Sequence, residues 1–282
     1  MWWPAMSGVL PALVPKEKLK DGNAVVGLLS NFGFVIGALI GGTTVTFFGS
    51  GWALLIDAFS FFVAGVLVWR LDIPPMERRE RTSVFNELKE GWFEFKSRSW
   101  VVAVVIAFTG LNACFEVLVQ VLGPLAFHEN ANGPRNWSLN LASLTLGMIC
   151  GGVIALKLHF RRPLFFGMIV IALSAVWDFA LAWQAPLLVT ICGAVIAGIA
   201  IGIFAVNWYT SLQSQIPEES FSRVNAYDAF GSFALAPLGI VVAGPLAMYY
   251  GVHTVLGVTG GVVFMSALFS LLVKSVRTLK EI

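Results

Sequence analysis

The segment VPKEKLKDGNA (residues 14–24) and the segment IPEESFSRVNA (residues 216–226) are each followed by a long apolar run. Aligned at a constant offset of 202, residues 10–49 and 212–251 share nine identities without a gap. The identical pairs are Leu10/Leu212, Pro15/Pro217, Glu17/Glu219, Asn23/Asn225, Ala24/Ala226, Ser30/Ser232, Gly37/Gly239, Gly42/Gly244 and Gly49/Gly251. We predict a duplicated loop–helix unit, as found in transporters built from repeats. Chance similarity between two glycine-rich apolar helices is the alternative.

The composition indicates that lipid is the main solvent of this chain. Apolar residues make up 57% of the 282 residues and charged residues 12%, and the mean hydropathy is +0.81. Soluble domains carry about 25% charged residues. The net charge of +2 gives no reason to expect a nucleic-acid partner. The three cysteines lie far apart inside apolar runs, which is typical of reduced packing residues.

Eight apolar runs are long enough to cross a bilayer, which needs about 20 residues per helix. They cover residues 23–48, 52–71, 99–127, 137–158, 163–184, 186–211, 224–250 and 252–274. Short breaks rich in turn-forming residues separate them. The fold class that we predict is therefore an all-α, polytopic membrane helix bundle.

Positive charge predicts the orientation of the bundle. If residues 23–48 start inside, 17 of the 18 Lys and Arg residues lie on the inner side, and Arg135 alone lies outside. Cytoplasmic loops carry such an excess, so both termini are expected in the cytoplasm. Both copies of the repeat then enter the membrane from the same side, which makes the repeat parallel.

The longest inner loop, residues 72–98, contains apolar side chains near helical spacing between charged ones. It predicts a short amphipathic helix along the membrane face, started by Ser83. The expected organisation is residues 15–71 as the last two helices of an N-terminal half, 72–98 as a cytoplasmic linker, and 99–282 as a six-helix C-terminal half.

The repeat also predicts what precedes its first copy. Within the second half, four spans (99–211) precede the second copy, whereas only a 14-residue apolar segment, residues 1–14, precedes the first. If the halves are equivalent, residues 1–14 are the remnant of a fourth helix, and the chain is truncated at its N-terminus.

The sequence resembles the major facilitator superfamily, in the branch similar to macrolide-efflux and enterobactin-export proteins. The resemblance covers essentially the whole chain and the last two-thirds of an ordinary member. The matching stretches are PALVPKEKLKDGNA (11–24), GWALLIDAFSFFVAG (51–65), FNELKEGWFEF (85–95) and, most specifically, LQSQIPEESFSRVNAYDAFGSFALAPLGIVVAGPLAMYYG (212–251). One departure is Ser222 before Arg223-Val224, where members often have glycine.

The resemblance implies an antiporter in a bacterial inner membrane, with helices equivalent to the family's fifth to twelfth. The implied partners are membrane lipid, a small amphipathic drug or siderophore to be exported, and protons as the coupling ion. The family's Gly-x-x-x-Asp-Arg gating loop between the second and third helices has no counterpart. After span 137–158, Arg161 and Arg162 match the basic part of this motif, but its acidic residue is missing. Arg223 is a further gating candidate.

Ionisable side chains inside spans are costly and are functional candidates by default. Asn112, Glu116 and Gln120 are spaced four apart, which predicts one polar stripe on span 99–127. The resemblance makes this span a cavity-lining seventh helix, where Glu116 could bind a cationic substrate or carry a proton. The alternative is a stripe that only hydrogen-bonds a neighbouring helix.

Three further acids lie in spans. Asp178 either needs a deep polar partner or faces outer water, and its place near a span end favours the second. Asp57, about 9 Å beyond Gly51 along the helix, is expected to make a structural hydrogen bond near a helix N-terminus. Asp228 is expected at the inner interface, close to Arg223. Asn207, near the end of span 186–211, either lines the cavity or has an end-of-helix role.

Small-residue motifs at Gly37/Gly41, Gly147/Gly151 and Gly198/Gly202 predict close helix packing, and Gly239 is the repeat partner of Gly37. The three histidines lie at different span ends, so no metal site or other cofactor is expected. A nucleophile elbow and a P-loop are both absent from the sequence. We expect a transporter rather than an enzyme, with a remnant that is inactive alone or a non-transporting membrane subunit as alternatives.

Overall fold

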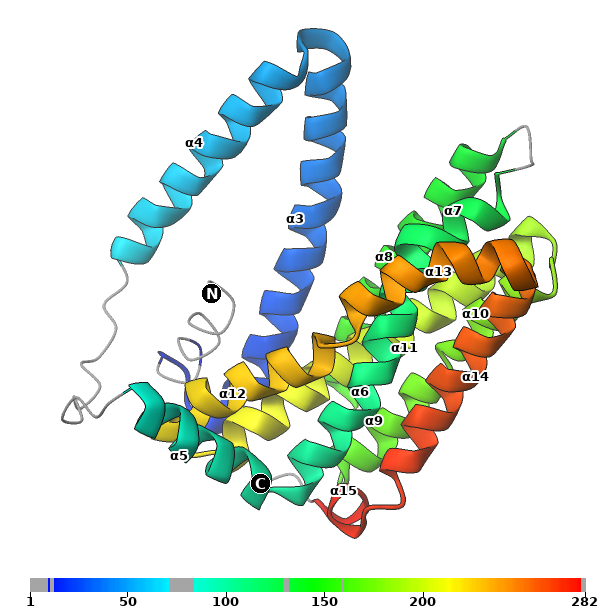
Figure 1. The fold of residues 1–282 in the computed structure, drawn as a ribbon. Helices are drawn as coiled ribbons and strands as arrows, with labels where there is room; N and C mark the ends of the chain where they lie inside the picture. The colour runs from blue at the N-terminus through cyan, green and yellow to red at the C-terminus, as the bar shows by residue number, and fades with distance from the viewer. Residues whose placement is uncertain (1–9, 11–12, 71–83, 129–131, 159, 280–282) are drawn as a thin grey trace.

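The computed structural model describes residues 10, 13–70, 84–128, 132–158 and 160–279, which form helices and short connections (Figure 1). Most of residues 1–14 and the predicted start at Ser83 lie outside this description. The elements are the 3₁₀ turn η1 (Lys16–Lys18), α3 (Leu19–Phe48), α4 (Ser50–Trp69), α5 (Val84–Ser97), α6 (Ser99–Val117), the π-helical turn η2 (Leu118–Leu122), α7 (Gly123–Ala126), α8 (Gly133–Lys157), α9 (Pro163–Ala172), α10 (Ala175–Ala182), α11 (Leu187–Gln215), α12 (Glu218–Phe233), α13 (Ala236–Tyr250), α14 (Val252–Ser270) and α15 (Lys274–Thr278).

Seven helical stretches in the described part of the chain have the length and apolar character to cross a membrane. They are Gly51–Trp69, Ser99–Ala126, Gly133–Lys157, Pro163–Ala182, Leu187–Gln215, Glu219–Tyr250 and Val252–Ser270, which confirms seven of the predicted spans in place. The remaining prediction, 23–48, lies inside α3, whose 30 residues rise about 45 Å. The predicted all-α membrane bundle is therefore confirmed.

Three spans contain an interruption of the regular α-helix, which the apolar pattern did not predict. The first contains the π-turn η2, directly before Gly123 and Pro124. The second breaks between α9 and α10, where the Ser174 hydroxyl donates to the carbonyl of Ile171 at 2.7 Å. The third breaks between α12 and α13, where Pro237 is the second residue of α13. Proline lacks an N–H, and such side-chain bonds disturb the helical ladder, so both bend helices.

The repeat has a matching backbone at its turns. Gly49 ends the first copy with φ of 86°, and Gly251 ends the second with φ of 84°. Glycine adopts this left-handed region without steric cost, so both copies turn into the next helix in the same way. The copies differ in between, because α3 is continuous whereas α12 and α13 are separate. The sequence explains this difference, since Val35 in the first copy stands where Pro237 stands in the second.

Glycines bring α8 and α11 into backbone contact. A Cβ added at Gly147 or Gly151 would meet the carbonyl of Val195 or Ile199, and one at Gly198 would meet the carbonyl of Leu144. The packing predicted for Gly147/Gly151 and Gly198/Gly202 is therefore confirmed, and the two motifs pack on each other.

Gly37 does not share this role. A Cβ added there meets no described atom within 4 Å, so the close packing predicted for the Gly37 motif is not found. The physical reason is the placement of α3, whose buried Ala24 packs among α8 and α11 residues near its N-terminal end.

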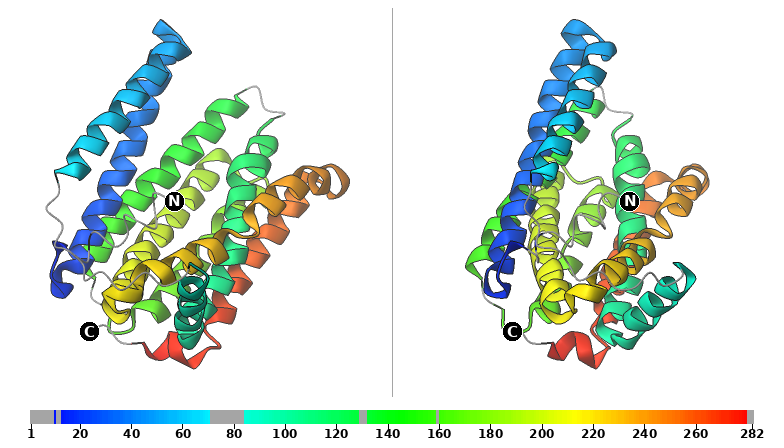
Figure 2. Two further views of the ribbon diagram at one scale, coloured as in Figure 1. Left: turned by 60° about the vertical axis from the view of Figure 1, so that its left-hand side comes forward. Right: turned by 90° about the vertical axis from the view of Figure 1, so that its left-hand side faces the viewer.

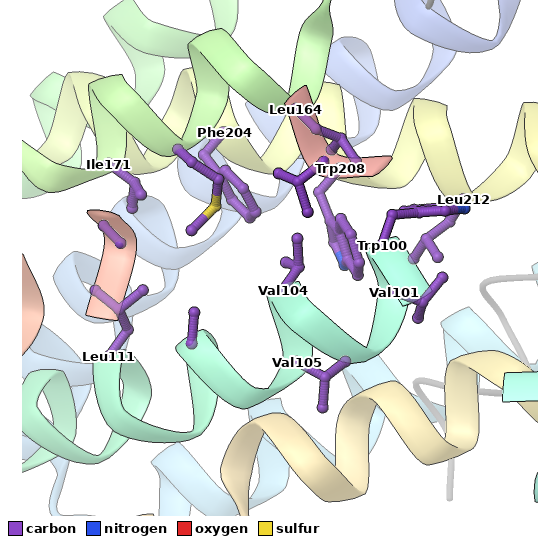
Figure 3. Close-up of a cluster of buried hydrophobic side chains, with 14 of the residues drawn as sticks. Trp100, Val101, Val104, Val105, Leu111, Leu164, Ile171, Phe204, Trp208 and Leu212 are labelled. Atoms are coloured by element: carbon purple, nitrogen blue, oxygen red, sulfur yellow. The ribbon is translucent and has the colours of Figure 1, made fainter. Parts of the chain in front are cut away.

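The α3–α4 hairpin stands beside the bundle formed by α6 to α14 (Figures 1 and 2). Helix α4 packs mainly on α3, and its large apolar side chains, such as Trp52, Phe59 and Phe62, are exposed. Such a surface is suited to contact with lipid. The core of the bundle lies between α6, α9, α11 and α14, where Trp100 and Val104 of α6 face Phe204 and Trp208 of α11 (Figure 3).

Candidate functional site

A cavity of about 400 Å³ lies between α6, α9, α10, α11, α12 and α14. Its wall is mainly apolar and aromatic; the aromatic members are Phe108, Phe115, Trp177, Phe204, Trp208, Tyr209 and Phe233. Its polar members are Asn112, Ser174, Asp178, Asn225, Asp228 and Ser232. An apolar pocket with a few convergent polar groups is the usual form of a small-molecule site.

Asp178 contributes one carboxylate to this cavity. It lies on the short helix α10, one turn after the break at Ser174, and its exposed fraction is 4%. The Thr259 hydroxyl on α14 donates to its Oδ1 at 2.9 Å. The favoured expectation, contact with outer water, is wrong because α14 covers this face. Gly260 allows the close approach, since a Cβ there would lie 3.0 Å from that of Asp178.

Asp228 contributes the second carboxylate. Its Oδ2 accepts a hydrogen bond from Trp208 Nε1 at 3.1 Å, and its Oδ1 accepts one from Ser232 Oγ at 3.0 Å. The exposed fraction is 8%, so the carboxylate is buried among helices, and its predicted place near the inner interface stays a prediction. The two donors come from α11 and from the next turn of α12, and they hold the carboxylate in the cavity wall.

Asn112 lines the cavity as predicted, and its amide also holds the broken helix. Its Nδ2 donates to the backbone carbonyl of Ser232 at 3.0 Å, and the Thr109 hydroxyl donates to the carbonyl of Gly231 at 2.8 Å. These carbonyls lie just before the α12–α13 break, where regular helical bonding stops. The two α6 side chains therefore stabilise the interruption.

Glu116 and Gln120 lie outside the cavity lining. Gln120 Nε2 donates to Glu116 Oε2 at 2.5 Å, so the structure joins these two but separates them from Asp178 and Asp228. Residues four apart are offset by about 40° around a helix, and the π-turn beginning at Leu118 changes the rotation further. The predicted stripe therefore turns away from the cavity after Asn112.

The remaining predicted residues are spread over the bundle. Asn207 is buried, and its Nδ2 finds no hydrogen-bond partner in the described structure. Asp57 is exposed on α4, beyond the first turn, where the expected dipole effect is absent. Arg161 and Arg162 are exposed between α8 and α9. Gly239 packs α13 on α6, because a Cβ there would lie 3.0 Å from Val117 Cγ2.

Helix α5 docks on α12, which the sequence reading missed. Arg223 Nη1 pairs with Glu90 Oε2 at 2.8 Å, and the Tyr227 hydroxyl donates to the carbonyl of Leu88 at 2.8 Å. The Tyr227 ring lies 5.6 Å from that of Trp92. Gly91 was the one sequence feature that could have indicated this docking. A Cβ there would come within 3.1 Å of the Tyr227 ring, so glycine permits the close approach.

We expect the tyrosine to contribute more to this docking than the ion pair does. Tyr227→Phe is expected to cost about 1 kcal/mol because it removes a hydrogen bond. A double-mutant cycle of Glu90→Gln and Arg223→Gln is expected to show a coupling near 0.5 kcal/mol, since the pair is partly exposed. Unfolding of the purified chain in detergent measures both. A coupling energy between Glu90 and Arg223 that exceeds the stability cost of Tyr227→Phe would contradict this ranking.

Within the described residues, no three His, Cys, Asp or Glu side chains gather into a group that could hold a metal ion. A family model described as Major Facilitator Superfamily matches residues 1–235. The chain belongs to the Major Facilitator Superfamily. Members of this superfamily are transporters rather than enzymes, and the chain is a multi-pass membrane protein.

The curated relatives of the chain include two exporters. It is similar to the multidrug efflux pump Tap of Mycolicibacterium fortuitum, with 24% identity over 246 residues that cover 83% of this chain and 58% of Tap. It is also similar to the enterobactin exporter EntS of Escherichia coli O1:K1, with 26% identity over 249 residues, 84% of this chain and 59% of EntS. The chain thus spans less than two thirds of these Major Facilitator relatives.

A solved structure supports the fold. The crystal structure of a bacterial homologue of the iron transporter ferroportin, in an outward-facing state, matches with a TM-score of 0.66 at 12% identity. The match covers 93% of this chain and 65% of that one. At this identity the likeness concerns the Major Facilitator fold alone.

Proposed function

We propose that the chain acts in secondary active export of a small amphipathic molecule across a bacterial inner membrane, in exchange for protons. The observation that carries this proposal is the apolar cavity with two buried carboxylates, Asp178 and Asp228. The names of the relatives, a multidrug efflux pump and an enterobactin exporter, support a drug or siderophore as the substrate class.

The chemistry of the cavity is compatible with exchange. A buried carboxylate needs a compensating positive charge, since an unpaired charge in an apolar site is costly. A proton can supply that charge, and so can a substrate. Asp178 and Asp228 are therefore the proposed coupling residues, and Glu116, with Gln120 bound to it, remains a second candidate for the proton path.

The proposed topology follows the charge distribution. Both termini and the α5 segment would lie in the cytoplasm, with residues 15–71 and 99–282 as parts of two halves joined by 72–98. Arg161, Arg162 and Arg223 would then lie on the cytoplasmic side, where the α5–α12 contact can restrain movement of α12.

The test uses the 282-residue chain reconstituted in liposomes. An imposed proton gradient is expected to drive ethidium movement, and Asp178→Asn or Asp228→Asn is expected to reduce the gradient-driven rate at least about tenfold, as for loss of one charge-dependent interaction. Asp57→Asn, an exposed acid on α4, is the matched control and is expected to retain the rate.

The outcomes separate the alternatives. No gradient-driven flux from a folded, binding-competent chain would overturn the proposal and favour a chain that is inactive alone or a non-transporting subunit. Equal loss in Asp57→Asn would show a general effect of charge removal and contradict the coupling role of the cavity acids. Full retention in Glu116→Gln would remove Glu116 from the proton path.

A further inference from the structure

The charges that line the cavity are all negative. Asp178 and Asp228 lie in its wall, and the described lining residues include no Lys, Arg or His. The described ion pairs, Arg98–Glu94 and Arg223–Glu90, lie at the α5 end of the bundle and use other acids. The cavity therefore favours positive charge on whatever enters it.

The two carboxylates have different surroundings. Both oxygens of Asp228 accept hydrogen bonds from protein donors, Trp208 and Ser232. In the described structure Asp178 has one side-chain donor, Thr259, on Oδ1 alone. A carboxylate can accept several hydrogen bonds over its two oxygens. One oxygen of Asp178 thus has no side-chain donor among the described residues, whereas both oxygens of Asp228 are bound to the wall.

Aromatic rings form the apolar side of the cavity. The Phe108 and Phe204 rings stack with centroids 4.4 Å apart, and the Trp208 ring follows Phe204 at 6.1 Å. Trp177 lines the cavity directly beside Asp178. Aromatic faces attract desolvated cations and pack well on aryl groups. The volume of about 400 Å³ is within the range of small-molecule pockets.

We propose that this cavity selects amphipathic monocations, with the charged centre at Asp178 and the apolar body along the wall of Phe108, Phe204 and Trp208. This inference rests on the proposed function only in taking the cavity as the substrate site. It names Asp178 as the residue that determines charge selectivity, and it gives Asp228 the positioning role of fixing Trp208.

The test compares two probes of the same shape and opposite charge, tetraphenylphosphonium and tetraphenylborate. Binding to the purified 282-residue chain in detergent is followed by tryptophan fluorescence, with protein-free micelles as the blank for partitioning. Tetraphenylphosphonium is expected to bind at least about tenfold more tightly than tetraphenylborate, as for one charge-assisted contact. Equal affinity of the two ions would overturn the proposal without any variant.

Variants then locate the selectivity. Asp178→Asn keeps the size of the side chain and is expected to abolish the preference for the cation, while Asp178→Glu restores it and Asp57→Asn leaves it unchanged. If Asp178→Asn does not fold, Asp178→Ser removes the same charge with a smaller side chain and is expected to lose the preference in the same way. A preference that survives in folded Asp178→Asn would contradict the assignment.

The binding and transport experiments can overturn the two proposals independently of each other. Charge-selective binding without gradient-driven flux would leave this inference standing and overturn the proposed function. Gradient-driven flux that carries both probes equally would leave the function standing and overturn the charge selectivity.

Discussion

Replacing Gly198 by leucine is expected to prevent recovery of the folded chain. The added Cβ would lie 2.8 Å from the Met148 nitrogen and 2.9 Å from Gly147 Cα, and it would also meet the carbonyl of Leu144. These are backbone atoms of α8, which cannot rotate away as a side chain can. Separating α8 from α11 would disrupt the contact that organises the bundle, at a cost above about 3 kcal/mol.

Gly244→Leu is the matched control for this prediction. Gly244 also lies in a membrane-spanning helix, but a Cβ there meets no described atom within 4 Å. Size-exclusion chromatography in detergent is expected to show a single symmetric peak for Gly244→Leu and aggregate for Gly198→Leu. Similar behaviour of the two variants would show that backbone contact at Gly198 does not determine stability.

Trp208→Ala is expected to have the second large effect, a loss of about 3–5 kcal/mol. The ring is 6% exposed and lies 5.7 Å from that of Trp100, edge to face, in the core that joins α6 to α11 (Figure 3). Removing it leaves a void, and it also removes the indole donor to Asp228. A buried carboxylate that loses a donor adds its own desolvation cost.

Trp208→Phe separates these two contributions. The phenylalanine keeps most of the ring contact but has no N–H, so it is expected to cost about 1–2 kcal/mol. Combining it with Asp228→Asn is expected to cost less than the sum of the two single changes. Thermal unfolding in detergent measures the stability of the wild type, the two single variants and the double variant. Strictly additive stability costs would contradict a direct bond between Trp208 and Asp228.

The fold was largely predictable because lipid imposes simple rules on sequence. Apolar length predicted seven of the spans, and the glycine motifs at Gly147 and Gly198 predicted a close contact, although not that they contact each other. The interruptions were not predictable from hydropathy. They depend on single residues such as Pro237 and Ser174, whose effect on the helix does not alter the mean apolar character.

The candidate site was predicted less well than the fold. Asp178 and Asp228 were expected to reach water because they lie near span ends, whereas tertiary contacts with Thr259 and Trp208 bury them. The position of a residue along its helix does not show which neighbouring helix covers its side chain. The spacing of Asp228 and Ser232, four residues apart, was a local signal for one of these contacts.

The break before Ala236 gives the second copy of the predicted repeat, α12 and α13, a hinge that the first copy, α3, lacks. The 15 residues of α13 form a lever about 22 Å long. A swing of about 10° at the hinge would carry the far end of that lever some 4 Å, by the same helix geometry. The first copy, an unbroken rod, can only tilt as a whole. If the duplication holds, the two aligned segments differ mechanically at the position where Pro237 stands opposite Val35.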